Sequence, residues 1–217
     1  MNRGIIQIQS NIQKVQKENN INHYSNTVYI QKRIIDVLLG TIILIISSPI
    51  VIYSIYRIKK ESSGSIIFKQ SRVGLNGKIF TCYKFRTMYE KSTFNPYTQK
   101  EDSRIFPFGQ IMRKYRIDEI PQIWNVIKGD MHIIGPRAEW NILVKEYEKT
   151  IPHYHQRHQV KPGITGLAQV SHPYGCGVED AKKKLKFDLE YIKKWSLWLE
   201  MKVVFRTVGV ILHREGI

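Results

Sequence analysis

The sequence contains few cysteines, and their positions argue against two familiar kinds of site. Only Cys82 and Cys176 occur in 217 residues, and neither belongs to a Cys-x-x-Cys pair or to a Cys/His spacing typical of zinc ligands. The sequence therefore indicates neither a zinc site nor a disulfide framework. We expect the protein to work in a reducing compartment such as the cytosol.

Acidic residues are scarce relative to basic ones. Lys and Arg number 34 against 18 Asp and Glu, which gives a formal net charge of +16. An excess of this size favours anionic partners such as nucleic acid, acidic lipid headgroups or phosphorylated substrates, and charge alone does not choose among them. The length suits one catalytic domain with an appendage rather than two large domains.

One long apolar run is present. Residues 37–55 carry no charged side chain, and as a helix this run approaches the ~20 residues needed to cross a bilayer. It lies too far from the N-terminus, and lacks the cleavage site, for an ordinary signal peptide. We expect residues 32–58 to form a membrane helix, preceded by a polar, weakly ordered tail at residues 1–31.

The flanks and the middle of this run leave two topologies open. Basic residues on both sides favour keeping both ends in the cytoplasm. Pro49 lacks an N–H group and its ring clashes with the carbonyl of Ile45, while Ser47 and Ser48 can bond the carbonyls so freed. Either the helix breaks at Ser48-Pro49 and returns to the same face, or it spans the membrane with a kink. The flanking basic residues are Lys32, Arg33, Arg57, Lys59 and Lys60.

Outside this run, a hairpin and a surface helix are predicted. Asn76-Gly77, between two runs rich in strand-forming residues, is a strong signal for a hairpin turn. Residues 181–192 have apolar side chains at helical spacing with lysines on the other face. The following stretch, residues 195–212, carries two Trp and several charges, and it suits either the membrane interface or an ordinary core helix.

The most informative stretch surrounds two adjacent carboxylates. Asp118 and Glu119 stand just before Pro121, a residue tolerated in the first turn of a helix. We expect that helix to run to about Ile127 and to end at Lys128-Gly129. At such a helix start, free N–H groups keep a carboxylate ionised and attract phosphate, although most Asp residues in this position only cap the helix.

Arginines on both sides of the pair make an anion pocket credible. Arg113 and Arg116 precede it, and Arg137 follows after Gly135-Pro136. Guanidinium groups match phosphate oxygens, and Mg²⁺ is typically held by one or two carboxylates together with substrate phosphates. We therefore expect phosphoryl chemistry here, with Mg²⁺ or Mn²⁺ as the cofactor.

A glycine-containing stretch, residues 158–170, is predicted to be a loop. Lys161 adds charge to it, and its glycines let backbone N–H groups approach a ligand, although the stretch matches neither a P-loop nor a dinucleotide motif. Three nearby histidines match no familiar metal spacing, and we interpret them as surface or substrate-proximal residues. They are His153, His155 and His158.

Three motifs together resemble those of the bacterial sugar transferase family, the monotopic polyprenyl-phosphate phosphoglycosyl transferases. They are KFRTM at residues 84–88, the carboxylate pair with PQIWNVIKGDM and GPR, and KPGITGLAQV at residues 161–170. The resemblance covers residues 32 to about 212. It implies a re-entrant membrane helix broken at Ser48-Pro49, interfacial helices, and the minimal form of the enzyme without the spanning helices of larger relatives.

The resemblance also implies a reaction. A phosphosugar would move from a nucleoside-diphosphate sugar, expected to be a UDP-sugar, to polyprenyl (undecaprenyl) phosphate, with release of a nucleoside monophosphate. Asp118 would be the nucleophile that forms a covalent aspartyl-phosphosugar, Glu119 would assist as a base, and both would hold the metal ion. Phosphate would be bound by Arg113, Arg137, Lys84 and Arg86, and the nucleotide would lie near Lys161 and Gly163.

We therefore expect an α+β, mainly helical fold with one re-entrant helix and a small β-hairpin. Residues 59–217 would form the catalytic domain with amphipathic interfacial helices, on the cytoplasmic face of the bacterial plasma membrane beside anionic headgroups. The reaction would be the first membrane step of exopolysaccharide, capsule, O-antigen or glycoprotein glycan assembly. Nucleic acid is not an expected partner, and homo-oligomer formation is left open.

Two other classes of function fit part of the sequence. A basic, membrane-attached adaptor for acidic lipid or nucleic acid explains the charge and the apolar run. It does not explain a carboxylate pair among basic clusters. A carboxylate-based phosphatase is the second class, and it would release inorganic phosphate instead of a nucleoside monophosphate.

Overall fold

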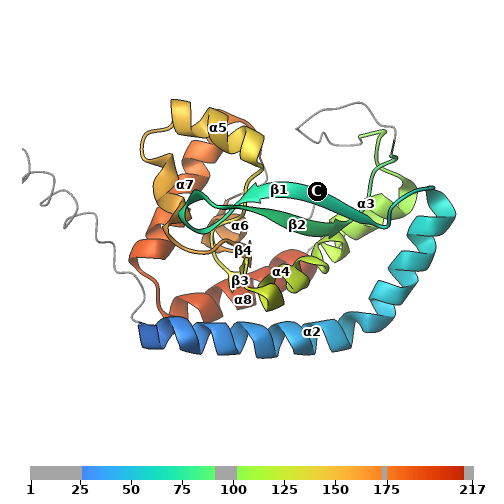
Figure 1. Cartoon of the computed structure of the whole chain (residues 1–217), viewed down its shortest axis with the longest axis horizontal. Coiled ribbons are helices and arrows are strands. Elements are labelled where there is room, and N and C mark those ends of the chain that lie inside the picture. The colour runs from blue at the N-terminus through green and yellow to red at the C-terminus, as the bar shows by residue number, and fades with distance from the viewer. Residues whose placement is uncertain (1–25, 91–101, 173–174, 213–217) are drawn as a thin grey trace, which may run out of the picture.

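The computed structural model describes residues 26–90, 102–172 and 175–212 of the chain. This part is mainly helical and carries two small two-stranded sheets (Figure 1). The predicted helical character and the small hairpin are confirmed, whereas residues 1–25 of the predicted tail lie outside the described residues. In chain order the elements are α2 (Asn26–Glu61), β1 (Ile67–Val73), η1 (Leu75–Gly77), β2 (Ile79–Phe85), α3 (Pro107–Lys114), η2 (Ile117–Glu119), α4 (Gln122–Lys128), β3 (His132–Ile134), α5 (Asn141–Thr150), η3 (Tyr154–Gln159), β4 (Gly163–Thr165), α6 (Leu167–Ser171), α7 (Val178–Lys193) and α8 (Leu197–Leu212).

Pro49 bends helix α2 without ending it. The helix continues through Pro49 to Glu61, and the Ser48 hydroxyl donates to the Ile45 carbonyl at 2.8 Å. This is the carbonyl that loses its usual N–H partner to the proline. Figure 1 shows the cyan part of α2 turning up from the line of the blue part. The expected break at Ser48-Pro49 is thus a bend in the structure, and the return to the same membrane face stays a prediction.

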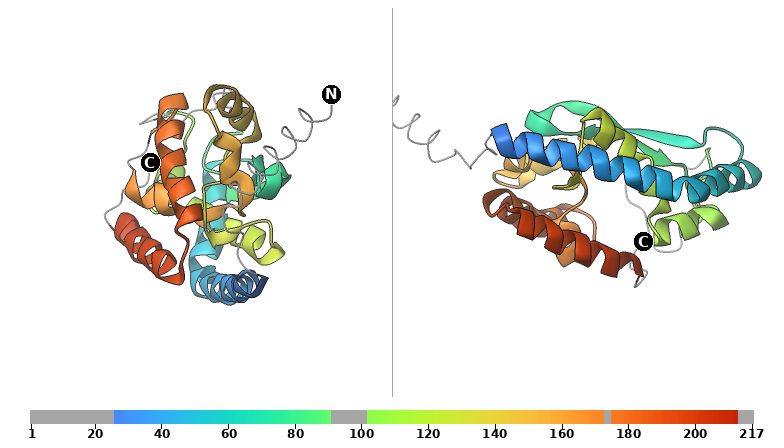
Figure 2. Two further views of the ribbon diagram at one scale, coloured as in Figure 1. Left: turned by 90° about the vertical axis from the view of Figure 1, so that its left-hand side faces the viewer. Right: turned by 90° about the horizontal axis from the view of Figure 1, so that it is seen from below.

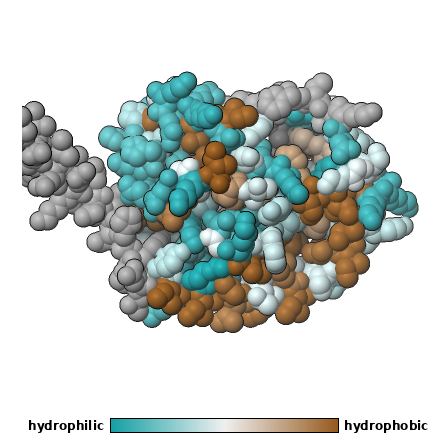
Figure 3. Space-filling model, viewed as in Figure 1, coloured by the Kyte–Doolittle hydropathy of each residue, from teal (hydrophilic) through white to brown (hydrophobic). Residues whose placement is uncertain are grey.

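Helices α2 and α8 carry a common apolar face. Among the described residues, α2 is the one helix long and apolar enough to cross a membrane, over Tyr29–Glu61, and 11% of its most apolar window is buried. Seen from below in Figure 2, α8 runs beside α2, and Figure 3 shows hydrophobic residues gathered along the edge where α2 lies. Exposed apolar residues of the two helices include Ile34, Leu38, Ile42, Ile45, Ile46, Ile52, Trp198, Phe205 and Val208.

The first turns of α2 are held to the rest of the protein by two cations. Lys32, only 3% exposed, pairs with Glu200 of α8. Arg33 donates its terminal N–H groups to two carbonyls in the last turn of α4, where carbonyls lack helical partners. These contacts order the chain before the apolar run. The helix already includes residues before the predicted boundary, residue 32.

A buried hydrogen-bonded pair, Asp36 and His132, joins α2 to β3. One oxygen of Asp36 contacts His132 Nδ1, and the other accepts from the backbone N–H of Ile133 at 3.1 Å. Desolvation lowers the pKa of His132, so the imidazole is neutral at pH 7 and its Nδ1 proton is assigned to this contact. Neither side chain is more than 5% exposed.

The hairpin predicted at Asn76-Gly77 is confirmed. Strands β1 and β2 pair antiparallel, with Val73 opposite Ile79 next to the turn. Asn76 (φ 54°) and Gly77 (φ 75°) both have positive φ, as an Asn-Gly hairpin turn requires. Near the other end of β2, Lys84 lies next to η2, the turn between α3 and α4.

Strands β3 and β4 pair in parallel, so the stretch predicted to be a loop contains a short strand. The two strands approach closely at glycines, because a Cβ on Gly163 would lie 2.1 Å from the backbone nitrogen of Gly135. The N–H of Gly163 donates to the Pro136 carbonyl at 2.9 Å. Gly163 therefore serves backbone packing, and its N–H is already used within the protein.

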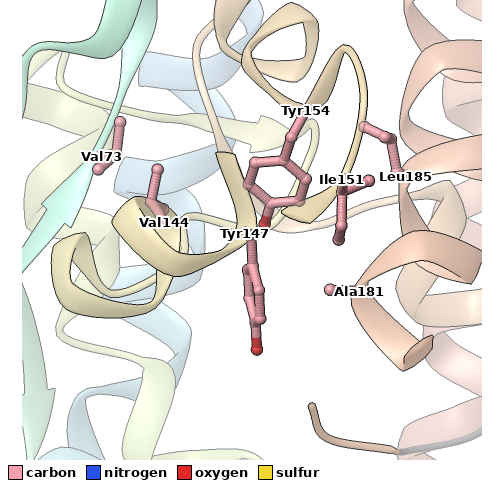
Figure 4. Close-up of a cluster of buried hydrophobic side chains, with 7 residues drawn as sticks. All are labelled: Val73, Val144, Tyr147, Ile151, Tyr154, Ala181 and Leu185. Atoms are coloured by element: carbon pink, nitrogen blue, oxygen red, sulfur yellow. The ribbon is translucent and has the colours of Figure 1, made fainter. Parts of the chain in front are cut away.

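Apolar side chains pack η3 and helices α5 and α7 against the hairpin (Figure 4). Tyr147 and Tyr154 meet edge to face with ring centroids 5.4 Å apart. Helix α7 is the predicted amphipathic helix, and it supplies two buried residues to this cluster. The members are Val73, Val144, Tyr147, Ile151, Tyr154, Ala181 and Leu185.

Candidate active site

Asp118 and Glu119 lie in η2, a single 3-10 turn between α3 and α4. Helix α4 starts only at Gln122 and ends at Gly129 (φ 97°), where the sequence predicted its end. The residue at its N-cap position is Pro121, and no side chain caps the helix. The carboxylates therefore precede α4 and do not form its first turn, and Asp118 is not a capping residue.

Glu119 is a buried carboxylate held by two cations. Its Oε1 accepts from Lys84 Nζ at 2.7 Å and from a terminal N–H of Arg137 at 2.8 Å. Burial alone would raise the pKa of Glu119, but the charges of Arg137, Lys84 and Arg116 outweigh it and hold this pKa well below its usual range. Glu119 is therefore fully ionised at neutral pH.

Asp118 differs from its neighbour in having no partner. Within the part of the chain that the structure describes, no group donates a hydrogen bond to its carboxylate. Desolvation raises the pKa of Asp118, an effect that the positive charge of Lys84 opposes and the negative charge of Glu119 reinforces. A carboxylate with all its lone pairs available can attack an electrophile or bind a cation.

A pocket of about 1560 Å³ opens beside Asp118. Its volume exceeds the roughly 300–1,000 Å³ typical of small-molecule sites, so it has room for a nucleotide sugar. The exposed Cys176 also lines it, whereas Cys82 is buried in β2. Arginines and a lysine near the carboxylates give the pocket its positive charge, and they are Lys84, Arg86, Arg113, Arg116, Arg137 and Arg157.

The predicted phosphate-binding residues differ in their partners inside the protein. Lys84 and Arg137 are paired with Glu119, as described above. Arg113 donates Nε–H to Thr87 Oγ1 at 2.9 Å. Arg86 is buried and donates to the carbonyls of two serines that directly follow α2, so its guanidinium fastens the end of that helix. The structure therefore brings all four cations to the pocket but uses Arg86 mainly for the backbone.

Lys161 lies apart from the carboxylates. Its Nζ is 5.2 Å from the centre of the Tyr29 ring in α2. Neither Lys161 nor Gly163 is among the described residues that line the Asp118 pocket. The pairing of β4 with β3 directs this segment toward α2, so the structure gives no support for the predicted place of these two residues beside a nucleotide.

The sequence did not indicate Arg157, which donates to the backbone of Arg137, or Asp188, which accepts from Arg157. Arg157 donates to the Arg137 carbonyl at 2.8 Å, to Asp188 Oδ2 at 2.9 Å and to the Tyr154 hydroxyl at 2.8 Å. Burial raises the pKa of Asp188 to about 6, which still leaves it ionised at neutral pH. No spacing in the sequence connects residues 137, 157 and 188, so only the fold could reveal this group.

The three histidines near this group differ in their exposure to solvent. His153 and His155 are exposed, as predicted. His158 is only 7% exposed, and desolvation by burial lowers its pKa to about 3. His158 is therefore not the surface residue that was one of the two alternatives predicted, because η3 turns its ring toward the cluster around Tyr154.

The oxygen donors at η2 fit a divalent cation that is also bound by substrate phosphates. Among the described residues, Asp118 has no partner, and the two ion pairs of Glu119 both use Oε1. The described residues contain no group of three or more His, Cys, Asp or Glu that could hold a metal ion by themselves. Two carboxylates that need phosphate oxygens to complete a shell are typical of Mg²⁺ sites.

The chain matches a known protein family over most of its length. Residues 27–214 match the family model described as bacterial sugar transferase. The chain is 43% identical over 187 residues to the UDP-N-acetylgalactosamine-undecaprenyl-phosphate N-acetylgalactosaminephosphotransferase of Aeromonas hydrophila, which covers 85% of this chain and 44% of the relative. It is 40% identical over 181 residues to the UDP-glucose:undecaprenyl-phosphate glucose-1-phosphate transferase of Escherichia coli, covering 82% of this chain and 39% of the relative.

A third relative is covered over more of its length. The chain is 38% identical over 193 residues to the UDP-glucose:undecaprenyl-phosphate glucose-1-phosphate transferase of Caulobacter vibrioides, which covers 87% of this chain and 72% of the relative. The chain spans less than half the length of the first two relatives. The family match covers most of the chain and includes both carboxylates, and the chain therefore belongs to the bacterial sugar transferase family.

Proposed function

We propose that this protein transfers a phosphosugar from a UDP-sugar to undecaprenyl phosphate and releases UMP. The observation that carries the proposal is the state of the two carboxylates. Glu119 is held by cations, while Asp118 has no partner in the part of the chain that the structure describes and lines a large basic pocket. The activities of the relatives named above support the substrate classes. Because those relatives act with different sugars, the sugar is left to the experiment below.

In the first step, a carboxylate oxygen of Asp118 attacks the phosphorus that bears the sugar. An O–P bond to Asp118 forms while the bond from this phosphorus to the bridging oxygen breaks, and UMP leaves with the electron pair. Burial raises the pKa of Asp118, so its ionised form is a stronger nucleophile than an ordinary aspartate. No hydrogen bond has to be broken before it attacks.

In the second step, an oxygen of undecaprenyl phosphate attacks the same phosphorus. The aspartyl O–P bond breaks, the carboxylate of Asp118 is regenerated, and the lipid leaves with a diphosphate-linked sugar. Two steps at one residue replace a direct encounter between two anionic substrates. The two anionic substrates can then bind in the basic pocket one after the other.

Glu119 and its two cations would form the fixed part of this site. Lys84 and Arg137 keep Glu119 ionised and hold it beside Asp118. Glu119 Oε2 and Asp118 would hold Mg²⁺ together with phosphate oxygens. When bound, the ion would neutralise phosphate charge during transfer.

The topology is part of the proposal. The apolar face of α2 and α8 would lie in the cytoplasmic leaflet, with α2 entering and returning on the same side. The basic residues at both ends of α2 and the bend at Pro49 support this arrangement. Single cysteines at Asn26 and Ser63, in a variant without the two natural cysteines, should both resist an external thiol reagent in intact spheroplasts. Labelling of either one from outside would show that α2 spans the membrane.

The activity itself can be tested with purified protein and a panel of UDP-sugars. With Mg²⁺ and without lipid, the right donor should release up to one equivalent of UMP and add one phosphosugar mass to the tryptic peptide of residues 117–128. Undecaprenyl phosphate should then make UMP release catalytic. Release of inorganic phosphate would indicate a phosphatase, and UMP release that strictly requires the lipid, with no adduct, would indicate direct transfer.

A further inference from the structure

Arg116 has a backbone conformation that arginine tolerates poorly. Its φ of 57° and ψ of 22° lie in the left-handed region, and it directly follows Tyr115, the C-cap residue of α3. Glycine is the usual residue at this point of a helix, because a Cβ is strained there. The chain therefore keeps an arginine where the fold alone favours glycine, and backbone strain of this kind gathers at functional sites.

The side chain of Arg116 also stands out from the other arginines of the pocket. It lines the same pocket as Asp118, yet it forms no hydrogen bond or ion pair within residues 26–90, 102–172 and 175–212. Every other arginine that lines the pocket has a partner in the protein. Those arginines are Arg72, Arg86, Arg104, Arg113, Arg137 and Arg157.

We infer that Arg116 is a further phosphate-binding residue, whose guanidinium receives a phosphate oxygen of the substrate beside Asp118. The inference rests on the proposed function and gives a specific role to a residue that the sequence showed only as one of the arginines beside the carboxylate pair. A guanidinium presents paired N–H donors that match a phosphate group. The charge of Arg116 reaches Glu119, because it is one of those that lower the pKa of that carboxylate.

Arg116→Gly separates this role from a role in folding. Glycine relieves the left-handed φ, so the variant should unfold at the same temperature as the wild type or higher. Loss of a charge-assisted hydrogen bond should weaken phosphate binding by about tenfold or more. Arg116→Lys keeps a positive charge without the planar fork and should recover part of the loss. A lower unfolding temperature for Arg116→Gly would overturn the argument from strain.

Two measurements distinguish the donor phosphates from the lipid phosphate. A raised KM for the UDP-sugar, with weaker binding of UDP in calorimetry, assigns Arg116 to the donor. A raised KM for undecaprenyl phosphate alone assigns it to the acceptor. Unchanged values for UDP-sugar, UDP and lipid in Arg116→Gly would refute the inference. If the wild type releases no UMP from any donor, the proposed function fails, while the comparison of UDP binding still tests Arg116.

Discussion

The buried charges that attach α2 to the protein and those around the pocket are paired in different ways. At the α2 contact, Asp36 and Glu200 each accept hydrogen bonds from groups on other elements. At the pocket, Glu119 is held in the same manner, but its neighbour Asp118 is left without a donor. Leaving even a half-buried carboxylate without a partner is unfavourable. The first cluster therefore fastens a helix, whereas the second leaves one carboxylate accessible from the pocket, as the proposed function requires.

Removing the unpaired carboxylate should have the largest effect. Asp118→Asn should lower turnover by about a thousandfold or more and abolish the protein adduct, because an amide is a poor nucleophile. Since Asp118 has no hydrogen-bond partner to lose, the unfolding temperature should not fall. Single-turnover UMP release and a thermal melt measure the two effects. Glu119→Gln is the matched control, and it should slow turnover but leave some adduct.

Removing divalent cations should come next. Without a cation, the carboxylates of η2 repel the substrate phosphates, so chelation should reduce UMP release by about a hundredfold or more. Addition of Mg²⁺ or Mn²⁺ should restore it. Full activity after thorough chelation would show that the cations of the protein suffice by themselves.

A change at Asp36, in the contact between α2 and β3, should have the opposite effect and lower stability without lowering turnover. Asp36→Ala removes the acceptor of His132 and of the Ile133 N–H, which should lower the free energy of unfolding by about 2–3 kcal/mol. Turnover per folded molecule should stay close to the wild-type value. Denaturant unfolding in detergent and an activity assay measure the two quantities. The control is Gln31→Ala on the exposed side of the same helix, and a large loss of turnover in Asp36→Ala alone would mean that the cluster serves catalysis.

A smaller effect should come from a change at Arg157, which donates to the backbone carbonyl of Arg137. Arg157→Lys replaces a fork that bonds both Asp188 and the Arg137 carbonyl by a point charge. We expect kcat to fall by about tenfold with little change in KM, because Arg137 would hold Glu119 less firmly. Steady-state kinetics measure the split. Lys145→Arg on the exposed side of α5 is the control, and an unchanged kcat in Arg157→Lys would exclude a positioning role.

The smallest effect concerns pH. The pKa of His158 is lowered by burial to about 3, while an unfolded chain protonates histidine near pH 6.5. Between these values the unfolded state binds more protons, so stability should fall as the pH drops below about 6.5. The loss between pH 6.5 and 5.5 should be about 1 kcal/mol, and His158→Gln should remove it. Denaturant unfolding at both pH values measures the slopes, and equal slopes would contradict the assignment.

Features that depend on near neighbours in the chain could be predicted from the sequence. The Asn76-Gly77 turn and the end of α4 at Gly129 follow from residues that favour positive φ. The bond from Ser48 to the Ile45 carbonyl follows from the proline beside it. The sequence did not predict that the helix would bend at Pro49 and continue. The hydrogen bond from Ser48 satisfies the carbonyl that the proline frees, and this favours a continuous helix over a break.

Contacts between distant residues could not be predicted. Lys32 and Glu200 are 168 residues apart, and nothing in the pattern of either segment indicates the pair. Arg86 shows the same limit. The sequence motif is the same whether the arginine binds a phosphate or a backbone carbonyl, so the partner cannot be predicted from it. Lys161 belongs to a motif typical of the family, yet strand pairing places it beside Tyr29.

One of the two cysteines gives the pocket a reactive group. Cys82 is buried, and burial raises the pKa of its thiol, so it reacts slowly with electrophiles. Cys176 is exposed on the pocket lining. A uridine nucleotide carrying a mild electrophile would be delivered to Cys176 by the pocket itself and would then be attached irreversibly. Covalent inhibitors of this design would be selective for those proteins of the family that carry a cysteine at the same place.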